Sequence, residues 1–153
     1  MPSLTMPEMR YLPREMPFDE LIKVLVAEHA VMSEGLGRMR EAAERKDFEG
    51  VSLALKQLDP VFRQHIVDEE AQILRLLIGE LGLKGAEDEI KVFQQHRPIY
   101  RLMQTVSELA SKEVAGLASE QLRLNVLFDD HARAEEGRVF PRALRCFGQK
   151  HPS

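Results

Sequence analysis

Residues 65–74 read HIVDEEAQIL and residues 131–140 read HARAEEGRVF, so the chain carries two related stretches 66 positions apart. Each stretch opens on a histidine that is followed four residues later by a glutamate. Neighbours on one face of an α-helix are three or four residues apart, so each stretch points an imidazole and a carboxylate in nearly the same direction. We therefore expect two helices, each with a His and Glu pair on one face.

Helical periodicity extends on both sides of these stretches. Apolar residues recur at steps of three and four, with no strand-like alternation of useful length. Turn signals, among them Gly82, Gly85 and Gly116, divide the chain, and Ser119 is expected to cap the last segment. Four helices with short connections favour an all-α, up-down-up-down four-helix bundle. The expected helices span about 18–45, 51–81, 86–112 and 119–147.

Each expected helix has one inward stripe, and each stripe carries a histidine near its middle. His29 and His96 lie 67 positions apart, so the chain reads as two helix pairs related by an approximate twofold axis. Such symmetry brings the four histidines to a similar level in the bundle. The predicted stripes are Leu21, Leu25, His29, Met32, Leu36 and Met39; Leu55, Leu58, Phe62, His65, Glu69, Ile73 and Leu76; Phe93, His96, Tyr100, Met103, Ser107 and Ala110; and Leu124, Phe128, His131, Glu135 and Val139.

The composition is that of a globular chain. Its 153 residues fit one domain, and 44% hydrophobic with 30% charged residues argues against disordered and membrane-embedded classes. A net charge of −4 provides no basic stripe for nucleic acid, and the single cysteine allows no internal disulfide and no thiolate cluster. No apolar run reaches the ~18 residues of a membrane span, and no signal peptide is recognisable, so we expect a cytoplasmic protein.

The two ends of the chain differ from its middle. Four of the eight prolines fall in residues 1–17, where each fixes its own φ and disfavours helix in the preceding residue. We expect an extended N-terminal arm over 1–17, the bundle over 18–147 and a short tail over 148–153. His151 lies in that tail, where we expect it to be solvated.

The inward histidines and glutamates together indicate a metal centre. A lone core histidine is usually satisfied by hydrogen bonds, and an isolated HxxxE pair is common on helix surfaces. Two carboxylates buried among four imidazoles are costly, however, unless cations lie between them. A pair of metal ions resolves this, with two imidazoles for each ion and both carboxylates as bridges. The candidate ligands are His29, His65, Glu69, His96, His131 and Glu135.

This ligand order resembles the hemerythrin-like, or HHE cation-binding, domain family. The order is His, HxxxE, His, HxxxE, and the resemblance covers residues 18 to about 147. It implies a four-helix bundle that holds two non-haem iron ions, bridged by carboxylates and by an oxo or hydroxo group. By that resemblance His29 and His65 bind one iron, His96 and His131 bind the other, and Glu69 and Glu135 bridge them. From the residues alone, iron, manganese and zinc remain alternatives, because imidazole and carboxylate accept all three.

Two departures from the oxygen-carrying hemerythrins bear on function. Those proteins have a second histidine four residues after the third-helix histidine, where this chain has Tyr100, and they end on HxxxxD, where this chain has HxxxE. Loss of an imidazole argues against reversible oxygen carriage. Tyr100 has two alternative roles, as a metal ligand and catalytic residue that favours ferric iron, or as a core residue whose hydroxyl hydrogen-bonds a ligand.

Three functions follow as alternatives. The leading one is a di-iron protein that reacts with or senses hydrogen peroxide, dioxygen or nitric oxide, with catalase-like or peroxidase-like activity as the enzymatic version and an unidentified electron donor as a further partner. The second is binding of oxygen, nitric oxide or iron without turnover, or iron donation, because the ligand order also resembles iron-sulfur repair proteins. The third is a metal-free or zinc-binding helical interaction module.

Acidic residues next to the candidate ligands form a further set. A neighbour in sequence is turned by about 100° around a helix, so these side chains are expected to be solvated or to contact the ligands from outside. They are Glu28, Glu70 and Glu136.

Overall fold

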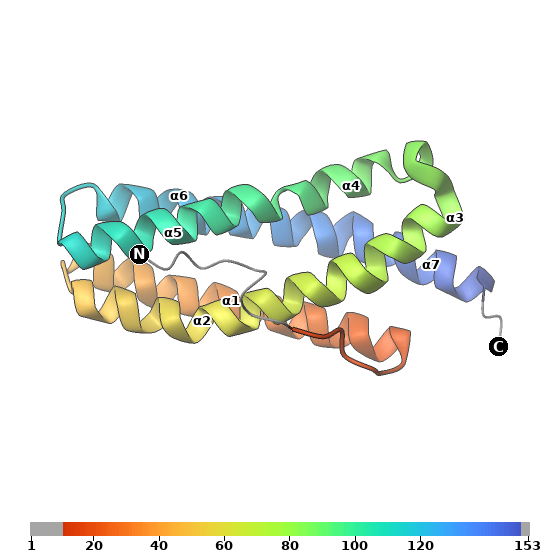
Figure 1. Ribbon diagram of the computed structural model, residues 1–153, viewed down its shortest axis with the longest axis horizontal. Helices are drawn as coiled ribbons and strands as arrows, with labels where there is room; N and C mark the ends of the chain where they lie inside the picture. Colours follow the sequence, from red (N-terminus) through yellow and green to blue (C-terminus); the bar gives the residue numbers. More distant parts are fainter. Residues whose placement is uncertain (1–10, 151–153) are drawn as a thin grey trace.

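The computed structural model describes residues 11–150, which form four long helices packed as a bundle (Figure 1). The predicted all-α bundle is confirmed. Three of the long helices are interrupted, two by π-helical turns (η) and one by a break at Gln95. In chain order, the long helices are α1 (Phe18–Glu44); α2 (Phe48–Asp68), η2 (Glu69–Leu74) and α3 (Arg75–Gly85); α4 (Glu87–Gln94) and α5 (His96–Lys112); and α6 (Leu117–Ala134), η3 (Glu135–Val139) and α7 (Phe140–Lys150).

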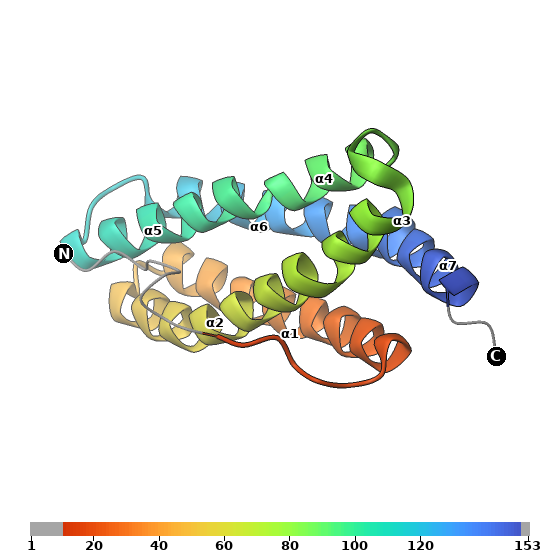
Figure 2. The ribbon, with the colours of Figure 1, turned by 45° about the vertical axis from the view of Figure 1, so that its right-hand side comes forward.

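The long helices follow an up-down-up-down order. α1 packs against α2 and α6, and α5 packs against the same two helices, so each long helix contacts the ones before and after it in the ring (Figures 1 and 2). At the far end α3 packs against α7, and α4 contacts both π-helical turns. Within the described residues, no helix combines the length and the apolar character that crossing a bilayer requires.

The buried interior consists of two apolar clusters with a polar layer between them. One cluster is built on α1, α2, α5 and α6 and includes Met32, Phe62 and Met103, while the other includes Leu25, Ile73 and Val139 near the opposite end. The inward histidines and glutamates fall between these two sets on every long helix. The polar layer is therefore closed from water by apolar packing above and below it.

Helix ends correct the predicted boundaries at two helix starts and at one helix end, because the fourth long helix runs to Lys150 instead of ending at 147. The second long helix starts at Phe48, because the Asp47 side chain accepts the Gly50 N–H at 2.9 Å and caps it. The fourth starts at Leu117 after Gly116, whose φ of 99° needs a glycine, so the predicted cap at Ser119 is wrong. The predicted inward stripe of the second long helix also ends one position early, since Leu77 is fully buried and Leu76 is only half-buried.

The described part of the N-terminal arm, residues 11–17, runs along the outside of α2 and η2. The Gln64 side-chain amide donates to the Leu12 carbonyl at 2.9 Å, and that of Gln72 donates to the Arg14 carbonyl at 3.0 Å. These bonds pair the arm's carbonyls with side chains of the second long helix. Residues 1–10 and the tail residue His151 lie outside the described part of the chain.

Candidate metal centre

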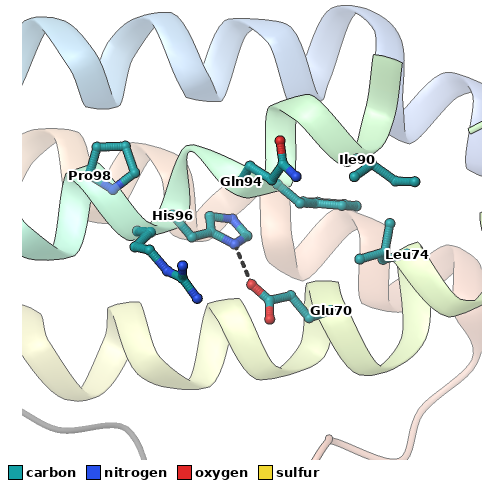
Figure 3. A pocket seen from close by; sticks show the side chains of 8 residues that line it. Glu70, Leu74, Ile90, Gln94, His96 and Pro98 are labelled. Carbon is teal, nitrogen blue, oxygen red and sulfur yellow. Dashed lines mark hydrogen bonds and ion pairs between the residues drawn. The ribbon is translucent and has the colours of Figure 1, made fainter. Parts of the chain in front are cut away.

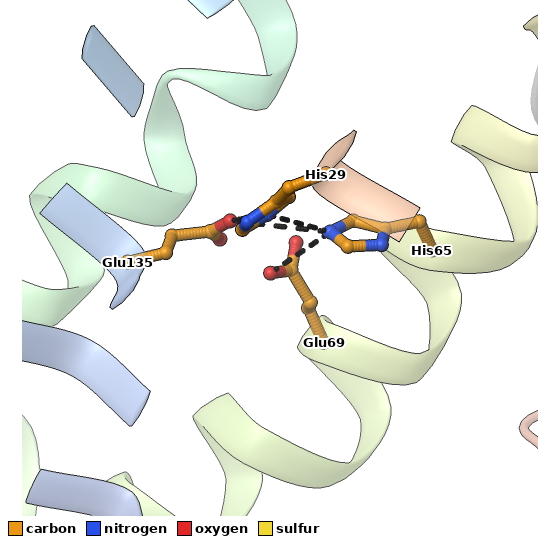
Figure 4. A group of neighbouring side chains, drawn as sticks. All are labelled: His29, His65, Glu69 and Glu135. Atoms are coloured by element: carbon orange, nitrogen blue, oxygen red, sulfur yellow. Dashed lines mark hydrogen bonds and ion pairs between the residues drawn. The ribbon is translucent and has the colours of Figure 1, made fainter. Parts of the chain in front are cut away.

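All six predicted His and Glu ligands meet in the polar layer. They form two overlapping groups that share both glutamates, and in each group one possible ligand atom per residue lies within 4.8 Å of the others; Figure 4 shows the group that contains His29 and His65. Every one of the six side chains is buried, and Glu69 and Glu135 are fully so. The groups are His29, His65, Glu69 and Glu135, and Glu69, His96, His131 and Glu135.

Each glutamate divides its two oxygens between the groups. Glu135 Oε1 lies 2.8 Å from His29 Nε2, and its Oε2 lies 3.2 Å from His131 Nε2. Glu69 Oε2 lies 3.3 Å from His65 Nε2, and its Oε1 lies 2.9 Å from His96 Nε2. One oxygen toward each pair of imidazoles is the arrangement that a carboxylate bridge between two metal ions requires. Two ions therefore fit this donor set.

Several of these buried atoms have no hydrogen-bond partner of acceptable geometry among the described residues. They include both oxygens of Glu69, Oε2 of Glu135 and Nε2 of His96. Glu69 Oε1 and His96 Nε2 are only 2.9 Å apart, so their distance is short but their angles do not make a hydrogen bond. An unsatisfied buried carboxylate is expensive, whereas a cation placed between these lone pairs satisfies them. The orphaned atoms thus support a metal site.

The outer nitrogen of each histidine is held by an acceptor from a neighbouring long helix. Because carboxylate and amide oxygens only accept, Nδ1 must carry a proton, and Nε2 is the nitrogen that faces the other ligands and would bind an ion in the Nδ1–H tautomer. This tautomer suits metal ligation. The Nδ1 distances are 2.7 Å from His29 to Glu136, 3.0 Å from His65 to Glu28, 2.8 Å from His96 to Glu70 and 2.8 Å from His131 to the Gln95 amide oxygen.

The π-helical turns begin at the two bridging glutamates themselves. An α-helix turns about 100° per residue, so each step of four residues drifts roughly 40° from a fixed face. The buried positions nevertheless follow one another by four, and a turn with hydrogen bonds to the fifth residue back absorbs the drift. The carboxylates and the apolar residues beyond them therefore stay on the inner side. These positions are His65, Glu69, Ile73 and Leu77, and His131, Glu135, Val139 and Ala143.

The close contacts between histidines and glutamates in the polar layer shift the pKa values of the metal-free protein. Burial by itself lowers the pKa of His65, but neighbouring carboxylates, Glu69 foremost, raise it well above its usual value. Burial also lowers the pKa of His96, and the same kind of contact, Glu135 foremost, raises it well above normal. Burial raises the pKa of Glu135, but its close contacts with Glu69 and the surrounding histidines bring it well below normal. The metal-free layer thus favours cationic His65 and His96 beside an anionic Glu135.

A charged chain links the arm to one ligand. Glu28, which accepts from His65, also accepts from the Arg14 guanidinium at 2.9 Å. Arg14 in turn donates from its Nε to the fully buried Asp68 at 2.6 Å and from its backbone N–H at 2.7 Å. Burial raises the pKa of Glu28, but His65 and Arg14 together lower it below normal. The arm therefore contributes to the surroundings of the site.

The Tyr100 hydroxyl is hydrogen-bonded to a buried arginine. The hydroxyl accepts from Arg63 Nη2 at 2.9 Å, and the guanidinium carbon lies 5.5 Å from the Tyr100 ring centroid. Arg63 is buried and also donates to Asp59 at 2.9 Å. The side chain of Tyr100 is half-buried, while Ile99 and Met103 occupy the deeper positions of α5. Sequence reasoning proposed a ligand or a ligand's partner, and the structure gives the hydroxyl a bond from Arg63.

Two surface pockets reach the outer faces of the site. One, of about 450 Å³, is lined by His96, Glu70, Phe93 and Arg97 among others, and Figure 3 shows the His96 to Glu70 contact at its base. The other, of about 600 Å³, is lined by His29 and Glu136 among others. At these pockets the exposed side chains of Glu70 and Glu136 lie between solvent and the two single histidines, His96 and His29, which have no glutamate four residues later.

Sequence reasoning missed several residues of the site. The three flanking acids were expected to be solvated or in contact with ligands, and the structure shows the contact. Gln95, Arg14 and Asp68 were missed, because no short spacing relates them to their partners. One signal was available: the twofold offset of 67 that relates His29 to His96 also relates Glu28 to Gln95.

No family model, curated protein or solved structure matches the chain. What stands is an all-α bundle whose buried His and Glu cluster can hold metal ions, with two overlapping groups that suit two of them.

Proposed function

We propose that the chain is a non-haem di-iron protein, similar to the hemerythrin-like family, that reacts with or senses hydrogen peroxide, dioxygen or nitric oxide. One observation carries this proposal. Glu69 and Glu135 each present one oxygen to each pair of imidazoles, as two bridged ions require. Imidazole and carboxylate are also ligands that iron accepts in both common oxidation states.

The chain's residues would prepare the site for such chemistry. The four outer acceptors hold the Nδ1 protons, so every Nε2 faces inward, where its lone pair would bind an ion. The apolar clusters exclude bulk water, while Glu70 and Glu136 are 48% and 42% exposed and connect the imidazoles to solvent. A bound iron pair would supply two electrons to a peroxide and recover two from a second one.

Peroxide disproportionation is the enzymatic version to test first. It converts two hydrogen peroxide molecules into one dioxygen and two waters, so it balances without an external electron donor. The protein is purified, its metals are quantified, and oxygen evolution is followed with an electrode against the same concentration of free iron. We expect two irons per chain and evolution above the free-iron rate, both lost in the matched variants His65→Ala and His131→Ala.

The remaining outcomes separate the alternatives. Iron without oxygen evolution, with a spectrum that changes on oxygenation and returns on degassing, would replace catalysis by ligand binding. Release of the iron to an acceptor without turnover would favour iron donation. Manganese or zinc at two per chain would retain the dinuclear site and reject iron. Absence of bound metal after loading would refute the proposal and favour a helical interaction module.

A further inference from the structure

The surroundings of the site follow the approximate twofold axis with one exception. Each glutamate after a bridging ligand accepts from the single histidine of the other half, as Glu70 does from His96 and Glu136 from His29. Each residue before a single histidine accepts from the HxxxE histidine. On one side that residue is Glu28, a carboxylate, and on the other it is Gln95, a neutral amide.

Because of this exception, the histidines of the two candidate metal positions have different hydrogen-bond acceptors. Both imidazoles of the His29 and His65 pair donate their Nδ1 protons to carboxylates. In the other pair only His96 does, because His131 donates to the Gln95 amide oxygen at 2.8 Å. A carboxylate acceptor makes an imidazole a more basic ligand, whereas a neutral amide does so less. The bridging carboxylates are shared, so they do not cancel the difference.

Arg14 does not neutralise this difference. It donates to Glu28 at 2.9 Å, but the same guanidinium also pairs with the buried Asp68 at 2.6 Å. One positive and two negative charges leave that group with a net charge of −1. The His65 side of the centre therefore keeps an anionic partner that the His131 side does not have in Gln95.

The local chain accounts for the position of Gln95. Pro98 has no N–H to offer the Gln94 carbonyl, so the helical ladder is interrupted and α5 restarts at His96 with Pro98 in its first turn. Gln95 occupies the break between α4 and α5, and its side chain reaches across to α6, where His131 lies. The break thus places an amide next to a ligand.

From these contacts we infer that Gln95 makes the two metal positions unequal, so that the His29 and His65 position fills first and the His96 and His131 position is the weaker, exchangeable one. This deepens the proposed function and presupposes its dinuclear centre. Changes in such outer partners typically alter metal affinity by about 10- to 100-fold, which sets the expected separation.

The test titrates the metal-free full-length protein with Zn²⁺ in calorimetry and in NMR of the histidine rings. Repulsion between two cations produces two binding steps even at equivalent positions, so the order of filling is the decisive readout. At one equivalent we expect the ring signals of His29 and His65 to move and those of His96 and His131 to stay. Equal movement of all four sets, or the reverse order, would overturn the inference.

Substitutions then test the cause. Gln95→Glu is expected to raise the affinity for the second Zn²⁺ ion by about 10- to 100-fold, toward the affinity for the first. Glu28→Gln is expected to lower the affinity for the first ion by a similar factor. Gln57→Glu adds the same charge on an exposed side chain of α2, eight positions before His65, and should change neither step. An unchanged second step in Gln95→Glu would overturn the inference, and the order of filling in the unaltered protein still decides if this variant does not fold. Failure of the unaltered protein to bind Zn²⁺ would instead contradict the dinuclear centre itself.

Discussion

At the scale of single residues, neighbours in sequence have different tasks. Glu69 and Glu70 are adjacent, yet Glu69 lies fully buried between both imidazole pairs, while Glu70 is half exposed and accepts the outer proton of His96. The same division holds for Glu135 and Glu136 on the other half. The difference of about 100° around the helix decides which carboxylate faces the candidate metal positions and which contacts a candidate ligand from outside.

This adjacency provides a matched pair of variants. Glu69→Gln keeps the side-chain shape but removes the anionic oxygens offered to both positions, so we expect the metal content to fall from two ions to one or fewer. Glu70→Gln keeps both ions and weakens binding by about 10- to 100-fold, because only an outer partner changes. Metal quantification after dialysis and titration against a competing chelator measure the two effects. Equal losses in both variants would contradict the assigned roles.

The Tyr100 hydroxyl supports a different prediction. Arg63 is buried beside Asp59 and donates to Tyr100, so Tyr100→Phe removes one of its acceptors and should cost about 1–3 kcal/mol in free energy of unfolding. Because the hydroxyl is engaged with Arg63, we expect the variant to retain two metals and the same visible spectrum. Chemical denaturation and optical spectroscopy of the ferric protein measure these quantities. Disappearance of a visible phenolate-to-iron band would restore Tyr100 as a ligand.

At the scale of elements, irregular segments position the site. The π-helical turns η2 and η3 keep the bridging carboxylates on the inner face, the break between α4 and α5 places Gln95, and residues 11–17 bring Arg14 to Glu28. A regular helix would turn the two buried carboxylates away from the bundle interior, since 3.6 residues per turn does not match a repeat of four. Local departures from helix geometry are therefore part of the site.

The arm can be tested through Arg14. Arg14→Ala leaves the buried Asp68 without its cation and frees Glu28, so we expect about 10-fold weaker binding of metal and a loss of about 1–3 kcal/mol in stability. Arg14→Lys should recover part of both. Arg38→Ala is a matched control, because Arg38 forms an exposed pair with Glu34 away from the site. Affinity by chelator competition and unfolding in urea check the prediction, and equal behaviour of the two alanine variants would contradict it.

At the scale of the whole molecule, a charged layer separates two apolar clusters, so its electrostatics affect the stability of the entire bundle. In the metal-free protein, contacts with carboxylates raise the pKa values of His65 and His96, and contacts with Glu69 and the histidines lower that of Glu135. Metal binding replaces protons on the imidazoles and links folding to metal concentration.

This linkage predicts a shift in the pH of maximum stability. A histidine whose pKa rises on folding stabilises the folded state below its usual pKa of 6.5, and the effect is lost as pH rises through the folded value. Glu135 contributes above its usual pKa of 4.5, and its effect is lost as pH falls through the lowered value. We expect the metal-free chain to lose stability on the alkaline side first, and the metal-loaded chain to have a higher Tm there. Melting curves of both forms from about pH 5 to 9 measure this, and superimposable profiles would refute it.

The fold and the six central residues were accessible to sequence reasoning for a simple reason. The repeated HxxxE spacing places His65 with Glu69 on one face without reference to the rest of the chain, and apolar steps of three and four give the helices. The predicted stripe of the second long helix is wrong only after Ile73, where Leu77 rather than Leu76 is buried, because a uniform helical period does not allow for the π-helical turn.

The sequence by itself determined the four helices, the four inward histidines and the two glutamates beside them, because each depends on periodicity within one helix. Only the tertiary structure decided which oxygen of Glu69 and Glu135 faces which imidazole, and that His131 donates to Gln95 whereas His65 donates to Glu28. It also brought Arg14 next to Asp68, which is 54 positions away in the sequence, and thereby to the site. These contacts join different helices and the arm, so packing and buried charge select them and no local spacing encodes them.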